Sequence, residues 1–290
     1  MGTFVSVTAE REETARALLP LVNDLEGDIS HRIPTSFVAR LNAGETVTLS
    51  EEEQEVLRLA LSVREATEGA FTPFAYPLTS LWQFDHAPAV PDAEAITAAL
   101  ETVNASSLQF AGNEAFLTGA LDLGAVGKGL AADRLAAALM ARGESGLITV
   151  GGSIAAVGGK NGEPWRVGVR DPFDGGKTVG TLLLRDAFVS TSGSYEKSFT
   201  ENGVLYHHIL DPHTGMPVQN GLLSVTVVAE NGALSDILST AAFAVGMERG
   251  AALCEAYGAH ALFITEDGGL YATEGMRALF ISTAGEVTAL

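Results

Sequence analysis

The sequence predicts an α+β protein in which mixed and antiparallel sheets pack with helices. Amphipathic helical patterns concentrate before about residue 105, whereas short strand-like runs and glycine-rich turns dominate after it. This segregation is typical of α+β proteins, since α/β proteins alternate the two element types. We therefore expect a single domain over residues 1–290, with a helix-rich subdomain over about 1–105 and a strand-rich subdomain over about 106–290, the two being intimately associated.

Helical patterns in the first part of the chain carry recognisable start and stop signals. Ser50 is followed three residues later by Glu53, which is a capping box, because each side chain can bind the backbone N–H of the other residue. A helix should begin there and end before Gly69. An earlier helical pattern over residues 11–27 contains Pro20, which should kink or interrupt it.

The remaining elements follow from hydrophobic periodicity and turn residues. We expect a structured loop over the aromatic, proline-bearing residues 71–90, and hairpins at the glycine-rich turns 151–162 and 174–177. Further helices are expected over residues 92–103, 127–141, 235–245 (with Ser235 as the cap) and 249–257. Strands are expected over 3–8, 107–110, 114–117, 119–122, 146–150, 153–158, 165–170, 179–184, 187–191, 205–209, 222–228, 260–265, 269–273 and 277–282.

Composition excludes several classes of protein. The chain has 17 Lys and Arg against 36 Asp and Glu, a formal net charge of −19, which disfavours nucleic-acid partners. Cys254 is the single cysteine, so an intramolecular disulfide and a cysteine-based zinc cluster are excluded. No apolar run is long enough for a membrane span. As written the chain predicts a cytoplasmic protein, or an extracytoplasmic or membrane-anchored one if a leader has been removed.

The segment Leu121–Gly129 is glycine-rich and runs into a predicted helix. Residues 127–132 fit the dinucleotide fingerprint G-x-G-x-x-A, but the next strand ends in Val150-Gly151-Gly152 without the acidic residue that holds a ribose. The phosphate-loop pattern fails as well, since Gly129 stands where Ser or Thr should be. Amides at a helix N-terminus still favour an anion, and Lys128 strengthens that preference. A tight turn without a ligand is the alternative.

Asp236 and Thr240 lie four residues apart, which places them on one face of a predicted helix. A carboxylate and a hydroxyl are oxygen ligands of the kind that Mg²⁺ prefers. The alternative is structural, because an acidic residue in the first turn of a helix is stabilised by the helix dipole and a threonine can simply face the core.

Two adjacent histidines, His207 and His208, end a predicted strand, so one should face the core and the other the opposite side. Asp211 follows in the turn Asp-Pro-His-Thr-Gly and can either orient a histidine ring or cap the turn. A base beside a phosphate cradle and a cation points to phosphoryl-group chemistry.

Taken in order, these segments resemble the FAD:protein FMN transferase family, the ApbE-type flavin transferases, over nearly the whole chain. That resemblance implies an ApbE-type, T-fold-like architecture. It is carried by the following matches: Met1–Thr3, Ser36–Asn42, Thr67–Phe71, Pro77-Leu78, Leu81-Trp82, Asp122–Gly129, Gly151-Gly152, Ser192–Glu196, His208–Pro217 and Ser224–Val227.

The resemblance also implies roles for individual residues. Magnesium would be bound by Asp236, Thr240 and the backbone carbonyl of Ala125, and His208 would be the catalytic histidine. The positions that would contact FAD are Met1, which would pack on the isoalloxazine ring, His31, Ala70, Phe71, Thr72, Asp122, Lys128 and Leu210, the last through its backbone.

Five positions depart from the family pattern. Thr72 stands where aspartate is usual, and His31 where several members have a stacking tyrosine. Ala125 and Gly127 exchange the usual small residues, which a ligand contact through the backbone tolerates, and Ser153 replaces a common polar neighbour of Gly152.

The implied activity is Mg²⁺-dependent transfer of FMN from FAD to a Thr or Ser hydroxyl of an acceptor protein, with release of AMP. The acceptors of such enzymes are flavin-bearing subunits of redox pumps and electron carriers. Two alternatives keep the same site: an Mg²⁺-dependent FAD pyrophosphatase, which forms FMN and AMP, and a non-catalytic flavin-binding protein.

Overall fold

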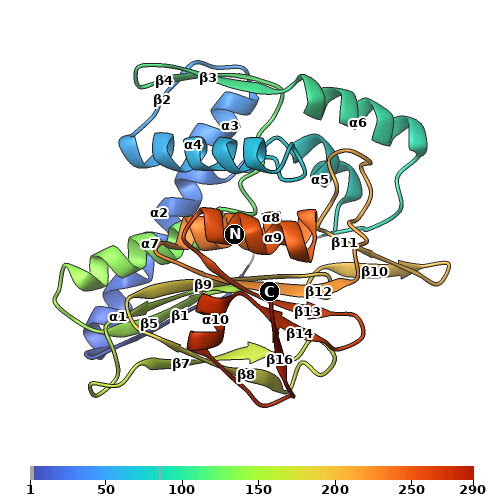
Figure 1. Cartoon of the computed structure of the whole chain (residues 1–290). Helices are drawn as coiled ribbons and strands as arrows, with labels where there is room; N and C mark the ends of the chain where they lie inside the picture. Colours follow the sequence, from blue (N-terminus) through green and yellow to red (C-terminus); the bar gives the residue numbers. More distant parts are fainter. Residues whose placement is uncertain (1–2, 85) are drawn as a thin grey trace. The chain divides into compact units, whose positions relative to one another are not determined.

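The computed structural model describes residues 3–84 and 86–290 and confirms an α+β fold (Figure 1). The chain forms two compact units, each built from several segments. The first unit comprises Met1–Asp24, Val126–Gly193 and Asn220–Leu290, and the second comprises Leu25–Ala125 and Ser194–Gln219. Both sides of residue 105 belong to the second unit, and the intimate association of two subdomains stays a prediction.

The first unit is organised on an eight-stranded sheet with the order β1-β5-β6-β9-β12-β13-β14-β16. Its neighbouring strands are antiparallel except for the parallel pair of β14 and β16. A two-residue hairpin, Gly151-Gly152, joins β5 to β6, as expected from the paired glycines. The strands are β1 (Val5–Ala9), β5 (Gly146–Val150), β6 (Ser153–Val157), β9 (Ala187–Gly193), β12 (Leu222–Ala229), β13 (His260–Thr265), β14 (Leu270–Ala272) and β16 (Val287–Ala289).

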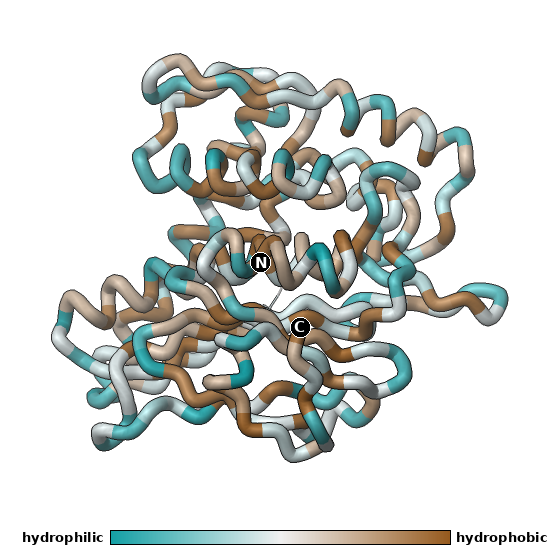
Figure 2. The backbone as a smooth tube through the Cα atoms, viewed as in Figure 1, coloured by the Kyte–Doolittle hydropathy of each residue, from teal (hydrophilic) through white to brown (hydrophobic). Residues whose placement is uncertain are grey.

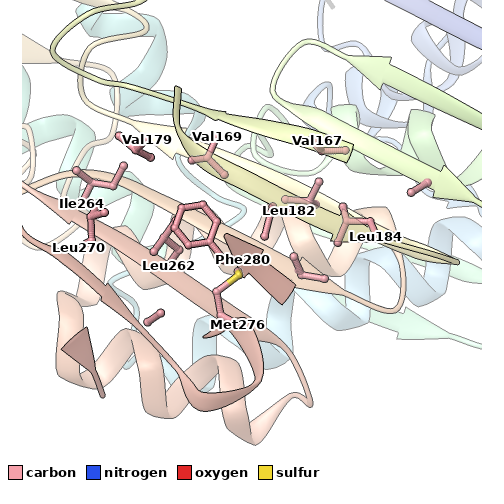
Figure 3. Close-up of a cluster of buried hydrophobic side chains, with 14 of the residues drawn as sticks. Val167, Val169, Val179, Leu182, Leu184, Leu262, Ile264, Leu270, Met276 and Phe280 are labelled. Atoms are coloured by element: carbon pink, nitrogen blue, oxygen red, sulfur yellow. The ribbon is translucent and has the colours of Figure 1, made fainter. Parts of the chain in front are cut away.

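A smaller sheet with the order β15-β8-β7 packs on one face of the large sheet. Its strands are β7 (Trp165–Arg170), β8 (Thr178–Leu184) and β15 (Phe280–Ser282). Val167, Val169 and Leu182 from this sheet meet Leu262 and Ile264 from β13 in a buried apolar core (Figure 3). Within the unit, hydrophobic residues gather in the strands and hydrophilic ones in the connecting loops (Figure 2).

Helices cover the opposite face of the large sheet. The helix α7 (Gly127–Met140) packs on β5 and β6, and α8 (Gly232–Val245) packs on β9 and β12 (Figure 1). The other helices of this unit are α1 (Glu12–Leu18) and α9 (Met247–Ala256), together with α10 (Glu274–Leu279), whose Met276 instead packs in the core shared with the small sheet. The helix pattern over residues 11–27 is divided at Pro20, which begins a separate helix, α2 (Pro20–Ile29). This division confirms the expected interruption.

The backbones of α7 and α8 touch where two glycines cross. A Cβ atom on Gly129 would lie 2.0 Å from the carbonyl oxygen of Gly232, and one on Gly232 would lie 2.2 Å from the carbonyl oxygen of Gly129. Asp133 of α7 also caps α8, because its carboxylate accepts hydrogen bonds from Gly232 N (2.6 Å) and Ala233 N (2.8 Å). The N-terminus of α8 is therefore fixed against the first turns of α7.

A buried carboxylate ties α1 to the turn before β5. The Glu144 side chain is 5% exposed and accepts hydrogen bonds from Arg11 Nε (2.9 Å) and Thr14 Oγ1 (2.7 Å). These bonds, first from Arg11 and then from Thr14, lower the pKa of Glu144 below its ordinary value. The ion pair anchors the N-terminal helix of the first unit.

The second unit is mainly helical. It contains a three-stranded sheet with the order β2-β4-β3 and the β10–β11 hairpin. Its helices are α3 (Phe37–Asn42), α4 (Glu51–Ala66), α5 (Tyr76–Trp82), α6 (Ala93–Ala105) and the end of α2. Its strands are β2 (Val47–Thr48), β3 (Ser107–Ala111), β4 (Glu114–Thr118), β10 (Ser198–Glu201) and β11 (Val204–His207). The capping box of Ser50 and Glu53 opens α4 as predicted.

Several expected elements are wrong. The stretch 71–90 contains α5, which Pro77 initiates rather than breaks, because proline is tolerated in the first turn of a helix. Residues 119–122 form no strand, and the expected strand 277–282 begins only at Phe280, after α10. The cap of α8 is Asn231, whose side chain accepts from Leu234 N at 2.8 Å, whereas Ser235 lies buried inside the helix.

No helix in the described ranges combines the length and the apolar character that a membrane crossing requires.

We predict that Gly129→Ala lowers the free energy of unfolding by about 1–3 kcal/mol, because the added methyl group meets the Gly232 carbonyl, which cannot rotate away. Urea-induced unfolding measures the change. The control is Gly27→Ala, another glycine in a helix, where nothing lies within 4 Å of the new Cβ. That control should be neutral or slightly stabilising. Equal effects of the two substitutions would contradict a tight crossing of α7 and α8.

We predict that Glu144→Gln is less stable than the wild type at neutral pH and that the difference shrinks on acidification. A folded-state pKa below the ordinary value of 4.5 contributes stability above that pH and loses it as the pH falls through the folded pKa. Urea unfolding from pH 3 to pH 7 measures the trend. Glu274→Gln removes an exposed ion pair with Arg277 and should show little change at any pH. A constant deficit of Glu144→Gln across this range would refute the linkage.

Candidate functional site

The first unit holds one buried carboxylate at the crossing of α7 and α8. The Asp236 side chain is 2% exposed, and its Oδ2 accepts a hydrogen bond from Gly129 N at 3.0 Å. The Lys128 ammonium lies 3.1 Å from Oδ1 and 3.4 Å from Oδ2. A carboxylate this far from water requires such partners, because desolvation of an unpaired charge is costly. The Asp236 carboxylate is therefore positioned to bind a positively charged group.

The turn between β5 and β6 lies beside Thr3 and the Lys128 side chain. Gly151 has a φ of +56°. A Cβ atom on Gly151 would lie 3.4 Å from Lys128 Cδ and 2.5 Å from Thr3 Oγ1. Both the backbone conformation and the packing therefore favour glycine at this position. These two constraints explain why the first of the paired glycines is a glycine in this chain.

A ladder of hydroxyl groups fixes α8 on the sheet. Ser190 Oγ lies 2.8 Å from Ser235 Oγ, and Ser192 Oγ lies 2.8 Å from Ser239 Oγ. The spacings match, because two residues along a strand and four along a helix both advance by roughly 6 Å. The ladder sets the rotation of α8 about its axis, and that rotation directs Asp236 toward Gly129.

Thr240 joins the end of this ladder. Its hydroxyl donates to the Asp236 carbonyl (3.3 Å) and lies 3.0 Å from Ser192 Oγ. Ser239 also donates to the Asp236 carbonyl, at 3.0 Å. With both of those protons committed, Ser192 donates to either Ser239 or Thr240. The oxygen of Thr240 keeps capacity to accept a cation.

In the second unit, Asp122 is held beside the loop that precedes α5. Its Oδ2 accepts from Thr79 Oγ1 at 2.6 Å and its Oδ1 from Gly124 N at 2.8 Å, while its N–H donates to the Pro73 carbonyl at 2.8 Å. Asn42 fixes the preceding residue, since its side chain bonds both the N–H (2.7 Å) and the C=O (3.0 Å) of Leu121. The segment 121–125 is therefore ordered by its own unit.

The loop after α4 carries three of the expected FAD positions. Phe71 and Thr72 are buried, whereas Ala70 is half-buried. Thr72 Oγ1 accepts from Phe74 N at 3.2 Å, so threonine supplies a local turn contact at the position where the family usually has aspartate. The ring of His31 lies 4.9 Å from that of Tyr76, at the end of the same loop.

The two adjacent histidines have different environments. His207 is buried, its Nε2 lies 2.9 Å from the Val218 carbonyl, and its Nδ1 accepts from Ile209 N at 3.3 Å. These contacts commit both ring nitrogens to the fold. His208 follows β11, is half-buried, and donates its N–H to the Lys197 carbonyl at 3.0 Å. His207 is thus more buried than His208, which lies just beyond the strand, and the expectation that the two rings face opposite sides stays a prediction.

Asp211 binds His213 rather than His208. Its Oδ1 lies 3.1 Å from His213 Nδ1, and His213 Nε2 lies 3.1 Å from the Glu68 carbonyl. Trp82 Nε1 donates to the Gly215 carbonyl at 2.9 Å. The turn after His208 is therefore hydrogen-bonded to Glu68 and, through Trp82, to α5.

The structure thus forms two groups of predicted residues. In the first unit, Lys128, Asp236 and Thr240 come together. In the second unit, the predicted residues lie on elements joined by the contacts above, and these residues are His31, Ala70, Phe71, Thr72, Asp122, His208 and Leu210. Ala125 ends the first segment of the second unit, and Val126 begins the second segment of the first unit. Met1 lies outside the described residues.

The sequence profile described as the ApbE family matches residues 1–263. This chain belongs to the ApbE family. It is 34% identical to the FAD:protein FMN transferase of Treponema pallidum (strain Nichols), with 92% of this chain and 81% of the relative covered. The corresponding protein of Escherichia coli (strain K12) is 30% identical, with 94% and 84% covered.

Solved structures agree with this membership. The ApbE protein of Thermotoga maritima superposes with a TM-score of 0.86 at 31% identity, with 96% of each chain covered. The flavin transferase ApbE of Vibrio cholerae gives a TM-score of 0.82 at 28% identity, again with 96% of each chain covered. The family resemblance and the fold expected from it are confirmed.

Sequence reasoning missed the residues that position Asp236. These residues act through tertiary contacts, and none belongs to a recognisable local motif. They are Gly232, Asp133 and the hydroxyl-bearing Ser190, Ser235 and Ser239. Asn231 before Gly232 was the available signal for the true start of α8, since asparagine is a preferred N-cap residue. With that start, Asp236 falls in the second turn of the helix rather than the first.

Proposed function

We propose that this chain is an FAD:protein FMN transferase that depends on Mg²⁺ and releases AMP. The observation that carries the activity is its similarity, over most of its length, to relatives that are named FAD:protein FMN transferase. The arrangement of oxygen donors around Asp236 supports the cation, and the contacts within the second unit support roles for His208 and the flavin-contacting loop.

In the proposed reaction, the hydroxyl oxygen of an acceptor Thr or Ser attacks the phosphorus of the FMN half of FAD. A new phosphorus–oxygen bond forms, the bridging bond of the diphosphate breaks, and AMP leaves with the bridging oxygen. The hydroxyl proton passes to His208. No oxidant or reductant is needed, because the flavin is transferred without a change in redox state.

The residues of the first unit fit a hard divalent cation. Asp236 offers a buried carboxylate, Thr240 lies one turn along the same helix, and an ammonium already lies 3.1 Å from Oδ1 of that carboxylate. With the carbonyl of Ala125, these would be the oxygen ligands of Mg²⁺. When bound, Mg²⁺ would neutralise the diphosphate and stabilise the charge that develops on the leaving phosphate.

The residues of the second unit would bind the flavin and manage the proton. Ala70, Phe71 and Thr72 form an ordered loop, Asp122 is fixed by Thr79, and the segment from His208 to Leu210 precedes a turn that is tied to Glu68. Imidazole is suited to general-base catalysis near neutral pH. His31 and Met1 are proposed to contact the flavin ring, and Lys128 a phosphate or ribose oxygen.

The activity is tested by incubating the protein with FAD, Mg²⁺ and a candidate flavinylated subunit of a redox pump or electron carrier. Transfer raises the mass of the acceptor by one FMN and produces AMP. AMP with free FMN would show a pyrophosphatase, and intact FAD would show binding alone. Either of the last two results, with an acceptor that a known transferase modifies in parallel, would overturn the proposal.

We predict that Asp236→Ala abolishes Mg²⁺-dependent transfer, because it removes the anionic ligand of the cation. The rate of AMP release measures the effect. Asp174→Ala is the matched control, since that carboxylate pairs with Lys177 at the surface of the same unit. Full activity of a folded Asp236→Ala protein would refute the assignment of the metal ligand.

We predict that His208→Ala slows transfer by roughly 10²-fold or more while leaving FAD affinity nearly unchanged, as expected for loss of a general base. Stopped assays give the rate, and fluorescence titration gives the FAD affinity. His86→Ala, at an exposed histidine, should change neither. If His208→Ala loses FAD affinity and keeps its rate at saturation, His208 is a binding residue.

A further inference from the structure

Lys128 lies against the carboxylate that is proposed to hold the cation. Its Nζ is 3.1 Å from Asp236 Oδ1 and 3.4 Å from Oδ2, and the other contact to that carboxylate described above is the N–H of Gly129, 3.0 Å from Oδ2. The Asp236 side chain is 2% exposed, whereas that of Lys128 is 29% exposed. The ammonium therefore supplies the neutralising charge from the solvent side.

Mg²⁺ and this ammonium compete for the same oxygens. Mg²⁺ binds carboxylate oxygens at about 2.0–2.1 Å. With both cations on one carboxylate, the ammonium would lie within a few ångströms of a double positive charge, where the repulsion is poorly screened by water. The two charges cannot both hold their preferred positions at Asp236.

The Lys128 side chain is flexible and reaches solvent. An ammonium is a compact charge on a flexible stem, unlike the planar fork of arginine. The side chain of Lys128 is 29% exposed, against 2% for Asp236. Asp236 has no such freedom, because the glycine crossing and the hydroxyl ladder fix α8.

We propose that Lys128 is the resident counter-ion of Asp236 and that a divalent cation displaces it. Lys128 therefore weakens the affinity of the site for the cation and stabilises the cation-free protein. Displacement makes the ammonium available to a phosphate oxygen of the ligand. This inference rests on the cation site proposed above and adds a positioning role to Lys128.

The first test measures Mn²⁺ binding to metal-free protein by electron paramagnetic resonance, without FAD or acceptor. Lys128→Met should bind Mn²⁺ about tenfold more tightly than the wild type, within the usual range for coupling between two sites. Lys128→Arg, which keeps the charge, should stay close to the wild type. Lys177→Met, at an exposed pair with Asp174, should leave the affinity unchanged. Unchanged or weaker binding by Lys128→Met would overturn the inference.

A second test uses the unmodified chain and does not depend on a variant that folds. The protein is treated with acetic anhydride with and without Mg²⁺, and acetylation of each lysine is measured by mass spectrometry. Mg²⁺ should raise the reactivity of Lys128 several-fold and leave Lys177 unchanged. Equal labelling of Lys128 in both conditions would show that the ion pair persists, and the inference would fail.

The two proposals fail differently. If the wild type binds no Mn²⁺, the cation site fails and this inference fails with it. If Asp236→Asn abolishes Mn²⁺ binding while Lys128→Met does not tighten it, the cation site stands and only the counter-ion role is wrong.

Discussion

The contact between the backbones of α7 and α8 is the constraint on which the first unit depends. Helices can approach this closely only where neither carries a side chain at the crossing, and Gly129 and Gly232 meet that condition from opposite sides. The same contact brings the N–H of Gly129 to the carboxylate of Asp236. Gly129, which fits part of a dinucleotide fingerprint, therefore allows the two helices to pack closely. Its N–H also helps to orient the buried carboxylate of Asp236.

The crossing also concentrates charge in a place that is otherwise apolar. Apart from Asp236, the helix α8 contains only apolar and hydroxyl-bearing side chains, and most of them are buried. Asp133 binds the free N–H groups at its start, and the serine ladder binds its sheet-facing side. The Asp236 carboxylate is stabilised inside this helix by the Lys128 ammonium and the N–H of Gly129, and these contacts support the cation site proposed for it.

The sequence predicted the fold class and most of the strands, because alternation and glycine turns are local signals. It also located the capping box of α4 and the effect of Pro20. It failed where a proline is compatible with either a loop or a helix start, and where tertiary contacts decide. Pro77 opens a helix inside a stretch expected to be a loop, and Ser235 is a buried partner of Ser190 rather than a cap.

The candidate site divides in the same way. The residues implied by the family resemblance could be named from ordered motifs, and the ion pair of Lys128 with Asp236 could not, since those residues are 108 positions apart. Asp211 is different, because it lies close in sequence to several histidines. The sequence alone did not decide which histidine ring it contacts. The structure shows that its carboxylate bonds the ring of His213 and the turn that follows.

Anomalous diffraction from crystals soaked in Mn²⁺ in the absence of FAD would locate the cation directly. We expect an anomalous peak about 2.2 Å from a carboxylate oxygen of Asp236, with the Lys128 ammonium withdrawn from that carboxylate. A peak at another location, or an undisturbed ion pair in crystals that bind Mn²⁺ elsewhere, would contradict this expectation.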